Sequence, residues 1–317
     1  MRNSYIDSIK TILIFSVVLT HCLVRNGGGK IDEYIVMNFL YSFNMPIFVF
    51  VSGFLFSTKK TWDKMLWGCL ELFTSYCLFQ CLWMILNHNA VTLQTIIIPQ
   101  FTLWYILSLV FWRIIVKVFS YVCVNKYAWL VLSIVISLCC GFIPLTRELS
   151  FQRTFSFLPF FIMGSMCRGT YVLDYIRKLN KKISLMIIFI LVIIFYQIGK
   201  PPYWILCGRS SFYDYPLLMT YSPLLKLCWY FYTIIGSVCI LNLMPDKFSI
   251  AKYGSRTLTV YLLHFFPIWF LQKMSFRSDS LLLLTCLSFV IFCFLLYIHQ
   301  FKIIRLLINP LYLCSRK

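Results

Sequence analysis

The sequence predicts an all-α, polytopic integral membrane protein. Of its 317 residues, 61% are hydrophobic and only 12% are charged, whereas soluble proteins are nearer half apolar and a quarter charged. The mean hydropathy of +0.82 comes from many separate apolar stretches, which are too long and too numerous for one soluble core. No stretch outside them is able to build a core, so we expect a single transmembrane domain over residues 1–317.

Ten apolar segments have about the 20 residues that a membrane-spanning helix needs. In order along the chain, they are residues 5–25, 34–56, 66–87, 103–123, 127–144, 154–168, 183–199, 223–244, 255–272 and 279–299. The first has no small-residue cleavage site and carries His21 where one would fall, so we expect a retained helix rather than a signal peptide.

Individual segments carry their own signals. Pro46 interrupts the second segment, and Pro159 lies within the short sixth segment. Membrane helices tolerate such residues when neighbouring helices satisfy the freed backbone groups. The fourth begins with Trp104 and Tyr105, which is typical of the membrane–water interface.

The Lys and Arg residues predict the orientation in the membrane. With the N-terminus inside, the inner segments carry more than twice as many Lys and Arg residues as the outer ones. By the positive-inside rule we expect both termini to be cytoplasmic. Such anchoring loops also explain the net charge of +19 better than nucleic-acid binding does. The fourteen Cys are scattered without metal-ligand spacing, so we expect packing residues and no metal site.

Three ionisable residues lie in the first apolar segment. Lys10 and His21 are eleven residues apart, which is roughly 16 Å of helix and a return to within about 20° of the same direction. They therefore share one stripe, and Asp7 is placed to pair with Lys10. Each residue also has an interpretation without a functional role. Lys10 then extends its side chain to the lipid headgroups, and Asp7 is a helix-start residue that the helix dipole favours. His21 is then a hydrogen-bonded structural residue. An intramembrane His is nevertheless a functional candidate by default.

Further candidates line later segments. Asn44 precedes the break at Pro46, and Ser52 with Gly53 offers a place for a ligand or another helix to approach closely. Trp104 suits a cavity wall or an interfacial belt. Arg153, at a helix mouth, suits an anionic group of a substrate or a lipid headgroup equally well.

The ninth segment carries the second buried histidine. His264 lies well inside the segment, and Tyr261 precedes it by about one turn on the same face. Together they favour a polar cavity. His88 and His299 lie at predicted helix ends and carry no assigned role.

These segments together resemble the acyltransferase-3 family of integral membrane O-acyltransferases, in particular the branch of fucose 4-O-acetylase and related acetyltransferases. The most specific element is a basic residue, ten intervening residues and a His, here Lys10 and His21. The stretches "FNMPIFVFVSGFLF", "LWYIL", "RTFSFLPFFIMG" and "SRTLTVYLLH" are similar to further family landmarks in the expected order. The family often has His at the position of Asn44, so Asn44 receives no catalytic role.

The resemblance implies transfer of an acyl group, usually acetyl from acetyl-CoA, to a sugar hydroxyl. Typical acceptors are bacterial cell-surface polysaccharides or their lipid-linked precursors, which places the protein in the inner membrane. The donor is a substrate, and no bound cofactor, metal or nucleic acid is implied. His21 is the candidate base or covalent acyl carrier, and Lys10 the candidate contact for the CoA phosphates. Asp7 positions Lys10, while Ser52, Trp104, Arg153, Tyr261 and His264 are candidates for lining the substrate cavity.

Two other classes stay open at this point. A transporter or flippase of lipid-linked saccharides is also polytopic and basic, but it needs a larger charged central path than these few mid-membrane charges supply. A structural membrane subunit without activity is the third class. The oligomeric state and the acceptor sugar do not follow from the sequence.

Overall fold

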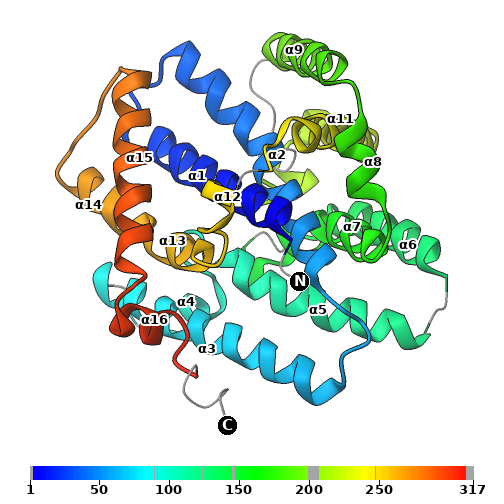
Figure 1. Ribbon diagram of the computed structural model, residues 1–317, viewed down its shortest axis with the longest axis horizontal. Coiled ribbons are helices and arrows are strands. Elements are labelled where there is room, and N and C mark those ends of the chain that lie inside the picture. Colours follow the sequence, from blue (N-terminus) through cyan, green and yellow to red (C-terminus); the bar gives the residue numbers. More distant parts are fainter. Residues whose placement is uncertain are drawn as a thin grey trace. The chain divides into compact units, whose positions relative to one another are not determined.

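The computed structural model describes residues 3–88, 90, 92–122, 125–144, 147–198, 207–246 and 248–311 (Figure 1). Within these residues the regular structure is helical, and the one β pairing is an isolated bridge between Gly27 and Ser278. The predicted class, an all-α polytopic membrane protein, is confirmed.

Each of the ten predicted segments contains a helix. Among the described residues, six helices are long and apolar enough to span a membrane. Five of them are α1 (Ser4–Asn26), α2 (Ile31–Leu55), α3 (Trp62–Leu86), α5 (Trp104–Val122) and α15 (Leu281–Ile298), and the sixth runs over Pro216–Leu243 and includes α11 (Ser222–Leu243). A seventh span results if α8 (Val172–Lys178) and α9 (Lys181–Ile198), which meet at 90°, are one broken helix. The number of ten spans and the side of the termini stay predictions.

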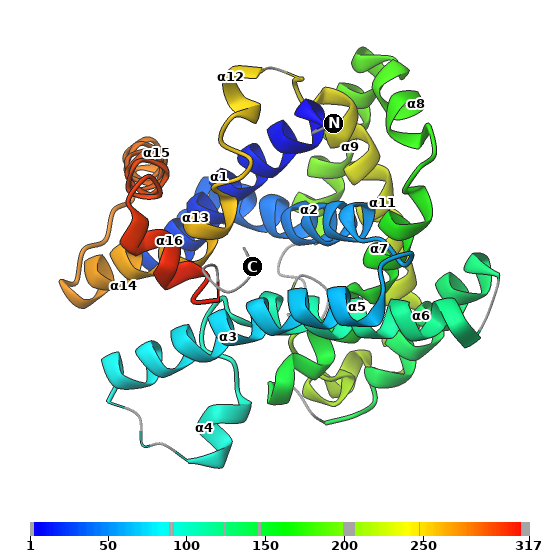
Figure 2. The same ribbon diagram turned by 60° about the horizontal axis from the view of Figure 1, so that its bottom comes forward.

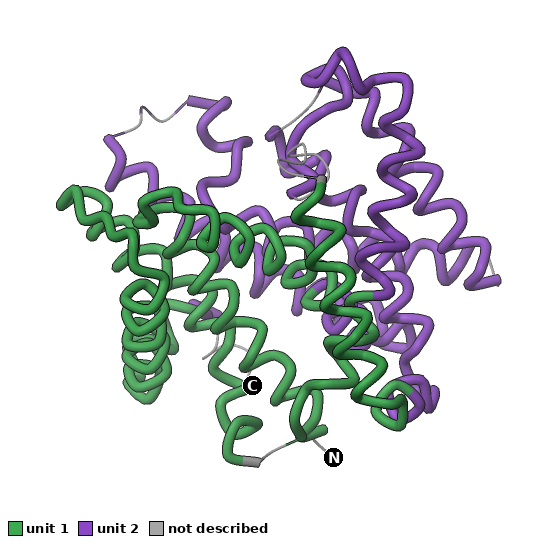
Figure 3. Tube along the Cα trace, turned by 90° about the horizontal axis from the view of Figure 1, so that it is seen from above, with its two compact units in different colours: residues 1–48, 176–199, 236–308 green, residues 49–175, 200–235, 309–317 purple. Residues whose placement is uncertain are grey.

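The chain forms two compact units, coloured separately in Figure 3. Unit 1 contains residues 1–48, 176–199 and 236–308, and unit 2 contains residues 49–175, 200–235 and 309–317. Three helices, α2, α8 and α11, contribute residues to both units. The prediction of one domain stays a prediction.

Helix α1 lies at the centre of unit 1. It packs against α12 (Phe248–Ala251), α13 (Thr257–Leu263), α14 (Phe265–Lys273) and α15, and Figures 1 and 2 both show α12 beside its N-terminal half. Ile9 and Ile14 are fully buried although, five residues apart, they point in different directions around the helix. A helix that is buried on more than one side belongs in an interior. The last helix, α16 (Lys302–Ile308), packs against α13.

The predicted ninth span is broken in the middle. α13 ends at Leu263 and α14 begins at Phe265, so His264 lies at the junction. Pro267 explains the break, because proline donates no backbone hydrogen bond and its ring clashes with the carbonyl four residues earlier. That carbonyl belongs to Leu263, the last residue of α13. Proline is tolerated in the first turn of a new helix, where α14 places it.

Unit 2 is built around α5 and α7 (Phe151–Cys167). Helix α6 (Lys126–Cys140) packs against α7, and α3 packs against α5. The remaining short elements are α4 (Leu93–Ile97), η1 (Glu148–Ser150), η2 (Phe212–Asp214) and η3 (Pro216–Tyr221).

Two glycines let α7 approach the end of α2 within unit 2. A Cβ atom on Gly53 would lie 2.0 Å from the carbonyl oxygen of Phe161, and one on Gly164 would lie 1.9 Å from that of Phe50. Neither separation is sterically possible, so the two backbones touch only because both residues are glycine. The close approach predicted at Ser52 and Gly53 is therefore a helix–helix contact.

The interior of unit 2 also holds a buried lysine. Lys226, on α11, donates hydrogen bonds to the carbonyl of Ser137 at 2.9 Å and to the hydroxyl of Ser156 at 3.0 Å. Tyr230, one turn later, donates to the carbonyl of Ser156 at 2.8 Å and lies 2.6 Å from the Ser137 hydroxyl. These contacts tie α6, α7 and α11 together.

Large apolar side chains stay exposed on several helices. Examples are Leu70 and Phe73 on α3, Phe189 on α9, and Leu282 and Val290 on α15. A soluble protein rarely leaves such continuous apolar faces in water. In a bilayer these faces meet lipid, which agrees with the class of protein.

Candidate active site

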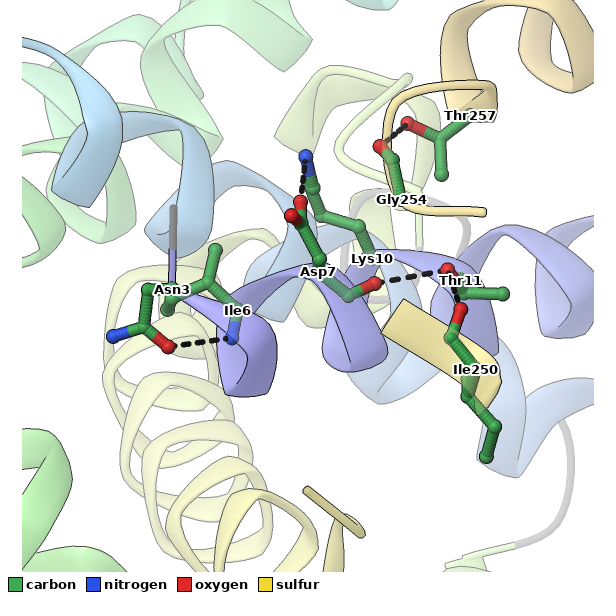
Figure 4. A network of polar contacts seen from close by, with 8 residues as sticks. All are labelled: Asn3, Ile6, Asp7, Lys10, Thr11, Ile250, Gly254 and Thr257. Carbon is green, nitrogen blue, oxygen red and sulfur yellow. Dashed lines mark hydrogen bonds and ion pairs between the residues drawn. The ribbon is translucent and has the colours of Figure 1, made fainter. Parts of the chain in front are cut away.

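The candidates Asp7 and Lys10 form an ion pair on the first turns of α1. The Nζ atom of Lys10 lies 2.7 Å from Oδ1 of Asp7 (Figure 4), and their side chains are 19% and 7% exposed. Asn3 caps the helix by accepting a hydrogen bond from the backbone of Ile6 at 3.2 Å. The predicted pairing is present. A carboxylate that is nearly buried requires such a partner.

The connection between α12 and α13 closes over this ion pair. A Cβ atom on Gly254 would lie 2.5 Å from Cβ of Asp7, so only glycine lets the connection pass so closely. Thr11, one turn after Asp7, lies within hydrogen-bonding distance of the carbonyls of Asp7, at 2.9 Å, and Ile250, at 3.3 Å (Figure 4). The start of α1 and the segment before α13 are thus fastened together around the charged pair.

His21 lies three turns further along α1, among aromatic rings. Its ring centroid is 5.3 Å from that of His264, 5.8 Å from Phe265 and 6.3 Å from Tyr41. Phe265 and Tyr41 present their rings nearly at right angles to the imidazole, while His264 is tilted by 35°. Arg25, one turn after His21, places its guanidinium 5.3 Å from the centre of the Phe265 ring. Unit 1 therefore brings the half-buried His21 and the buried His264 together.

His264 is completely buried at the junction of α13 and α14. Its Nδ1 atom lies 3.0 Å from the carbonyl oxygen of Val260 and 2.8 Å from that of Tyr261. The ring of Tyr261 is 6.1 Å away, so the predicted pair on one face is present.

Asn44 joins α2 to α1 between the two ends of the Lys10–His21 stripe. Its Oδ1 accepts from the Ser16 hydroxyl at 2.7 Å, and its Nδ2 donates to the Thr20 hydroxyl at 3.2 Å. Tyr41, which contacts His21, lies one turn before Asn44 on the same helix. The sequence analysis did not select Tyr41 or Ser16. The polar Asn44 before Pro46 was the feature that could have indicated a polar contact between these two helices.

The other three candidates gather in unit 2. Ser52 hydrogen-bonds to the Tyr105 hydroxyl at 2.6 Å, and the ring of Tyr105 contacts that of Trp104 at 6.1 Å. The guanidinium of Arg153 lies 4.7 Å from the centre of the Trp104 ring, and its Nε donates to the carbonyl of Cys207 at 3.3 Å. Ser52, Trp104 and Arg153 thus belong to one connected cluster, with Tyr105 as the link that the sequence did not select.

The helices and their buried ionisable groups define a polytopic membrane protein of the class in which such groups mark sites of chemistry or transport. The sequence matches the family model of an acyltransferase domain over residues 3–299, so the chain belongs to the acyltransferase-3 family. It is an integral membrane acyltransferase. The resemblance inferred from Lys10, His21 and the later landmarks is thereby confirmed for the family, while the fucose O-acetylase branch stays a prediction.

No curated protein matches the sequence significantly, and no solved structure does so either.

Proposed function

We propose that this protein is an O-acetyltransferase that moves an acetyl group from acetyl-CoA to a sugar hydroxyl. The acceptor is a cell-surface polysaccharide or its lipid-linked precursor, and the protein acts in the inner membrane of a bacterium. The observation that carries the proposal is the placement of His21. It lies beside a second histidine and two aromatic rings, on the same helix as the ion-paired Lys10.

In this reaction the sugar oxygen attacks the thioester carbonyl, and the carbon–sulfur bond breaks. His21 accepts the proton of the sugar hydroxyl, because a neutral imidazole is a base near physiological pH. The proton then passes to the departing CoA thiolate, so the products are the acetyl ester and CoA thiol. A covalent route, in which a nitrogen of His21 carries the acetyl group between donor and acceptor, uses the same residue.

The remaining candidates receive supporting roles. Lys10 contacts the CoA phosphates from the cytoplasmic side, and Asp7 holds it in position through the 2.7 Å ion pair. His264 lies beside His21, and Tyr261 lies beside His264, so both are candidates to line the substrate cavity around His21. In unit 2, the aromatic face of Trp104 suits a sugar ring, and Arg153 suits an anionic group of the acceptor. Ser52 supports this cluster through Tyr105.

The decisive test uses purified protein, radiolabelled acetyl-CoA and surface polysaccharide as the acceptor. We expect His21→Ala to lower the rate of acetyl transfer by about 10²- to 10⁴-fold, the usual contribution of a general base. The matched control is His88→Ala, because His88 is an exposed histidine at the end of α3. Full activity of His21→Ala at normal membrane levels would contradict the assignment, and a wild type that moves saccharides without transferring acetyl would establish the transporter instead.

A further inference from the structure

The hydrogen bonds of His264 fix which of its nitrogens carries a proton. Nδ1 faces two backbone carbonyls, those of Val260 at 3.0 Å and Tyr261 at 2.8 Å. A carbonyl oxygen only accepts hydrogen bonds, so Nδ1 must be the N–H donor. In a neutral imidazole the other nitrogen, Nε2, is then an acceptor with a free lone pair.

This acceptor is buried and unused. Nε2 of His264 has no hydrogen-bond partner among the described residues, although the whole side chain is inaccessible to solvent. Most buried polar atoms in native proteins are paired, because an unpaired one loses its water without compensation. An unpaired acceptor in the interior is therefore available to a donor that approaches it.

The surroundings of His264 identify that donor. Of the rings that contact it, Phe265 has no hydrogen-bonding group, and Tyr261 makes no hydrogen bond to Nε2. The remaining ring is His21, whose centroid is the nearest at 5.3 Å. A neutral or protonated imidazole always offers at least one N–H donor.

We propose that His264 is a positioning residue that accepts the N–H of His21 through Nε2 during the reaction. This inference rests on the proposed function, because it assigns His264 a specific part in the chemistry of His21. With one nitrogen of His21 donating to His264, the other nitrogen keeps its lone pair and faces the acceptor hydroxyl. The arrangement follows the general rule that a catalytic base is oriented by a third group behind it.

The same contact assists the proton transfer. When His21 takes the proton of the sugar hydroxyl, its ring becomes positively charged, and a lone pair on His264 stabilises that charge. When the thiolate of CoA leaves, the proton moves from His21 to sulfur, and His264 returns to its starting state. His264 itself neither gains nor loses a proton in this sequence.

Two substitutions separate this role from a merely structural one. His264→Asn keeps an amide at the position of Nδ1, which continues to donate to Val260 and Tyr261, but it removes the acceptor at Nε2. His264→Gln places an amide oxygen near Nε2 and removes the donor at Nδ1. We expect His264→Asn to lose about 10- to 100-fold in kcat, as is usual for residues that orient a functional group. His264→Gln should retain most of the activity.

The opposite order would overturn the proposal. If His264 only closes the junction between α13 and α14, then Asn should equal or exceed Gln, and thermal unfolding should follow the same order as activity. Equal and full activity of both variants would also overturn it, since neither the acceptor nor the donor would then matter.

A second measurement does not depend on activity. The protein has four histidines, so nitrogen NMR of histidine-labelled protein in detergent is able to resolve the ring nitrogens of His21. We expect one dominant tautomer of His21 in the wild type and a mixture in His264→Asn. Unchanged His21 signals would refute the hydrogen bond. If the tautomer changes but the wild type transfers no acetyl group, then the proposed function fails while the contact between the histidines stands.

Discussion

At the scale of single residues, the charge of Lys10 has one observed partner, Asp7, and one proposed partner, the phosphates of CoA. Lys10 neutralises Asp7, whose side chain is only 7% exposed, while its own side chain is 19% exposed. A buried carboxylate that loses its partner is strongly destabilising. Lys10 therefore has a partner within the protein, and the proposed reaction adds a contact with the phosphates of the donor.

Charge at position 10 should determine the affinity for acetyl-CoA. We expect Lys10→Arg to keep much of the activity, because the guanidinium retains the charge and the pairing with Asp7. Lys10→Ala should raise KM for acetyl-CoA by about 10-fold or more, since a hydrogen bond to a charged group contributes about 1.5–3 kcal/mol. Steady-state kinetics with varied acetyl-CoA measures both. Identical KM values for the Arg and Ala variants would show that Lys10 does not contact the donor.

The sequence predicted the residues of α1 better than their partners. Helical geometry alone places Lys10 and His21 on one stripe and Asp7 beside Lys10, because all three lie on the same helix. The contact between His21 and His264 joins positions far apart along the chain, and periodicity says nothing about which helices meet. Lys226 was likewise visible as a cation at a helix edge, but its partners Ser137 and Ser156 come from two other helices.

At the scale of elements, the crossing of α2 and α7 depends on two missing side chains. Gly53 and Gly164 let the helices touch backbone to backbone, and Ser52 continues the contact toward α5 through the Tyr105 hydroxyl. Since Ser52 belongs to the cluster of Tyr105, Trp104 and Arg153, any displacement of α7 should also disturb the proposed acceptor side.

A methyl group at position 164 should therefore be costly. The Cβ atom of Gly164→Ala would lie 1.9 Å from the carbonyl oxygen of Phe50 and 2.8 Å from the backbone nitrogen of Phe54, so the helices must move apart. Overpacking of this kind costs about 1–3 kcal/mol, and we expect a lower midpoint of thermal unfolding in detergent.

The matched control is Gly68→Ala in α3. There the nearest atom to an added Cβ is Nη1 of Arg113 at 3.5 Å, an ordinary contact. Alanine is a better helix former than glycine, so this variant should be as stable as the wild type or more stable. Equal stability of Gly164→Ala and Gly68→Ala would mean that the close crossing of α2 and α7 is not maintained in the membrane.

The predicted elements were most accurate where apolar runs are uninterrupted. The first segment, expected over 5–25, is α1 (Ser4–Asn26), and the last, expected over 279–299, is α15 (Leu281–Ile298). The ninth was expected as one helix, but Pro267 divides it into α13 and α14. The short helices α4, α12 and α16 were not predicted, because four to seven residues show no hydrophobic period.

At the scale of the whole molecule, some of the Lys and Arg residues that predict the orientation in the membrane also hold connections between helices together. Lys117 donates to the carbonyls of Thr58 and Lys60, both at 2.7 Å, and so holds the connection between α2 and α3. Arg168 donates to the carbonyls of Phe54 and Leu55 at the end of α2. Cations at the C-terminal end of a helix are favourable there. The same residues contribute to the count that predicts the cytoplasmic side.

That orientation determines where the proposed enzyme meets acetyl-CoA, which is a cytoplasmic metabolite in the proposed reaction. We expect a short epitope inserted between Leu179 and Asn180 to be hidden from antibody in intact spheroplasts and detected after permeabilisation. Five basic residues surround or approach this exposed connection, namely Arg168, Arg177, Lys178, Lys181 and Lys182, and such clusters are retained inside. An epitope inserted after Ser275, in the connection between α14 and α15, should be detected without permeabilisation.

Retained acetyl transfer by both insertion variants serves as the control for folding. If the first epitope is detected from outside, the later half of the chain has the opposite orientation to the predicted one. One missed or additional span reverses the orientation of everything after it. Lys10 lies at the start of α1, before the first epitope, so its side of the membrane would not change. An inverted later half would then place the segment around Gly254 on the opposite side of the membrane from the ion pair that it covers. The contact between Gly254 and Asp7 forbids such an arrangement. The epitope result therefore tests the topology and the cytoplasmic entry of the donor together.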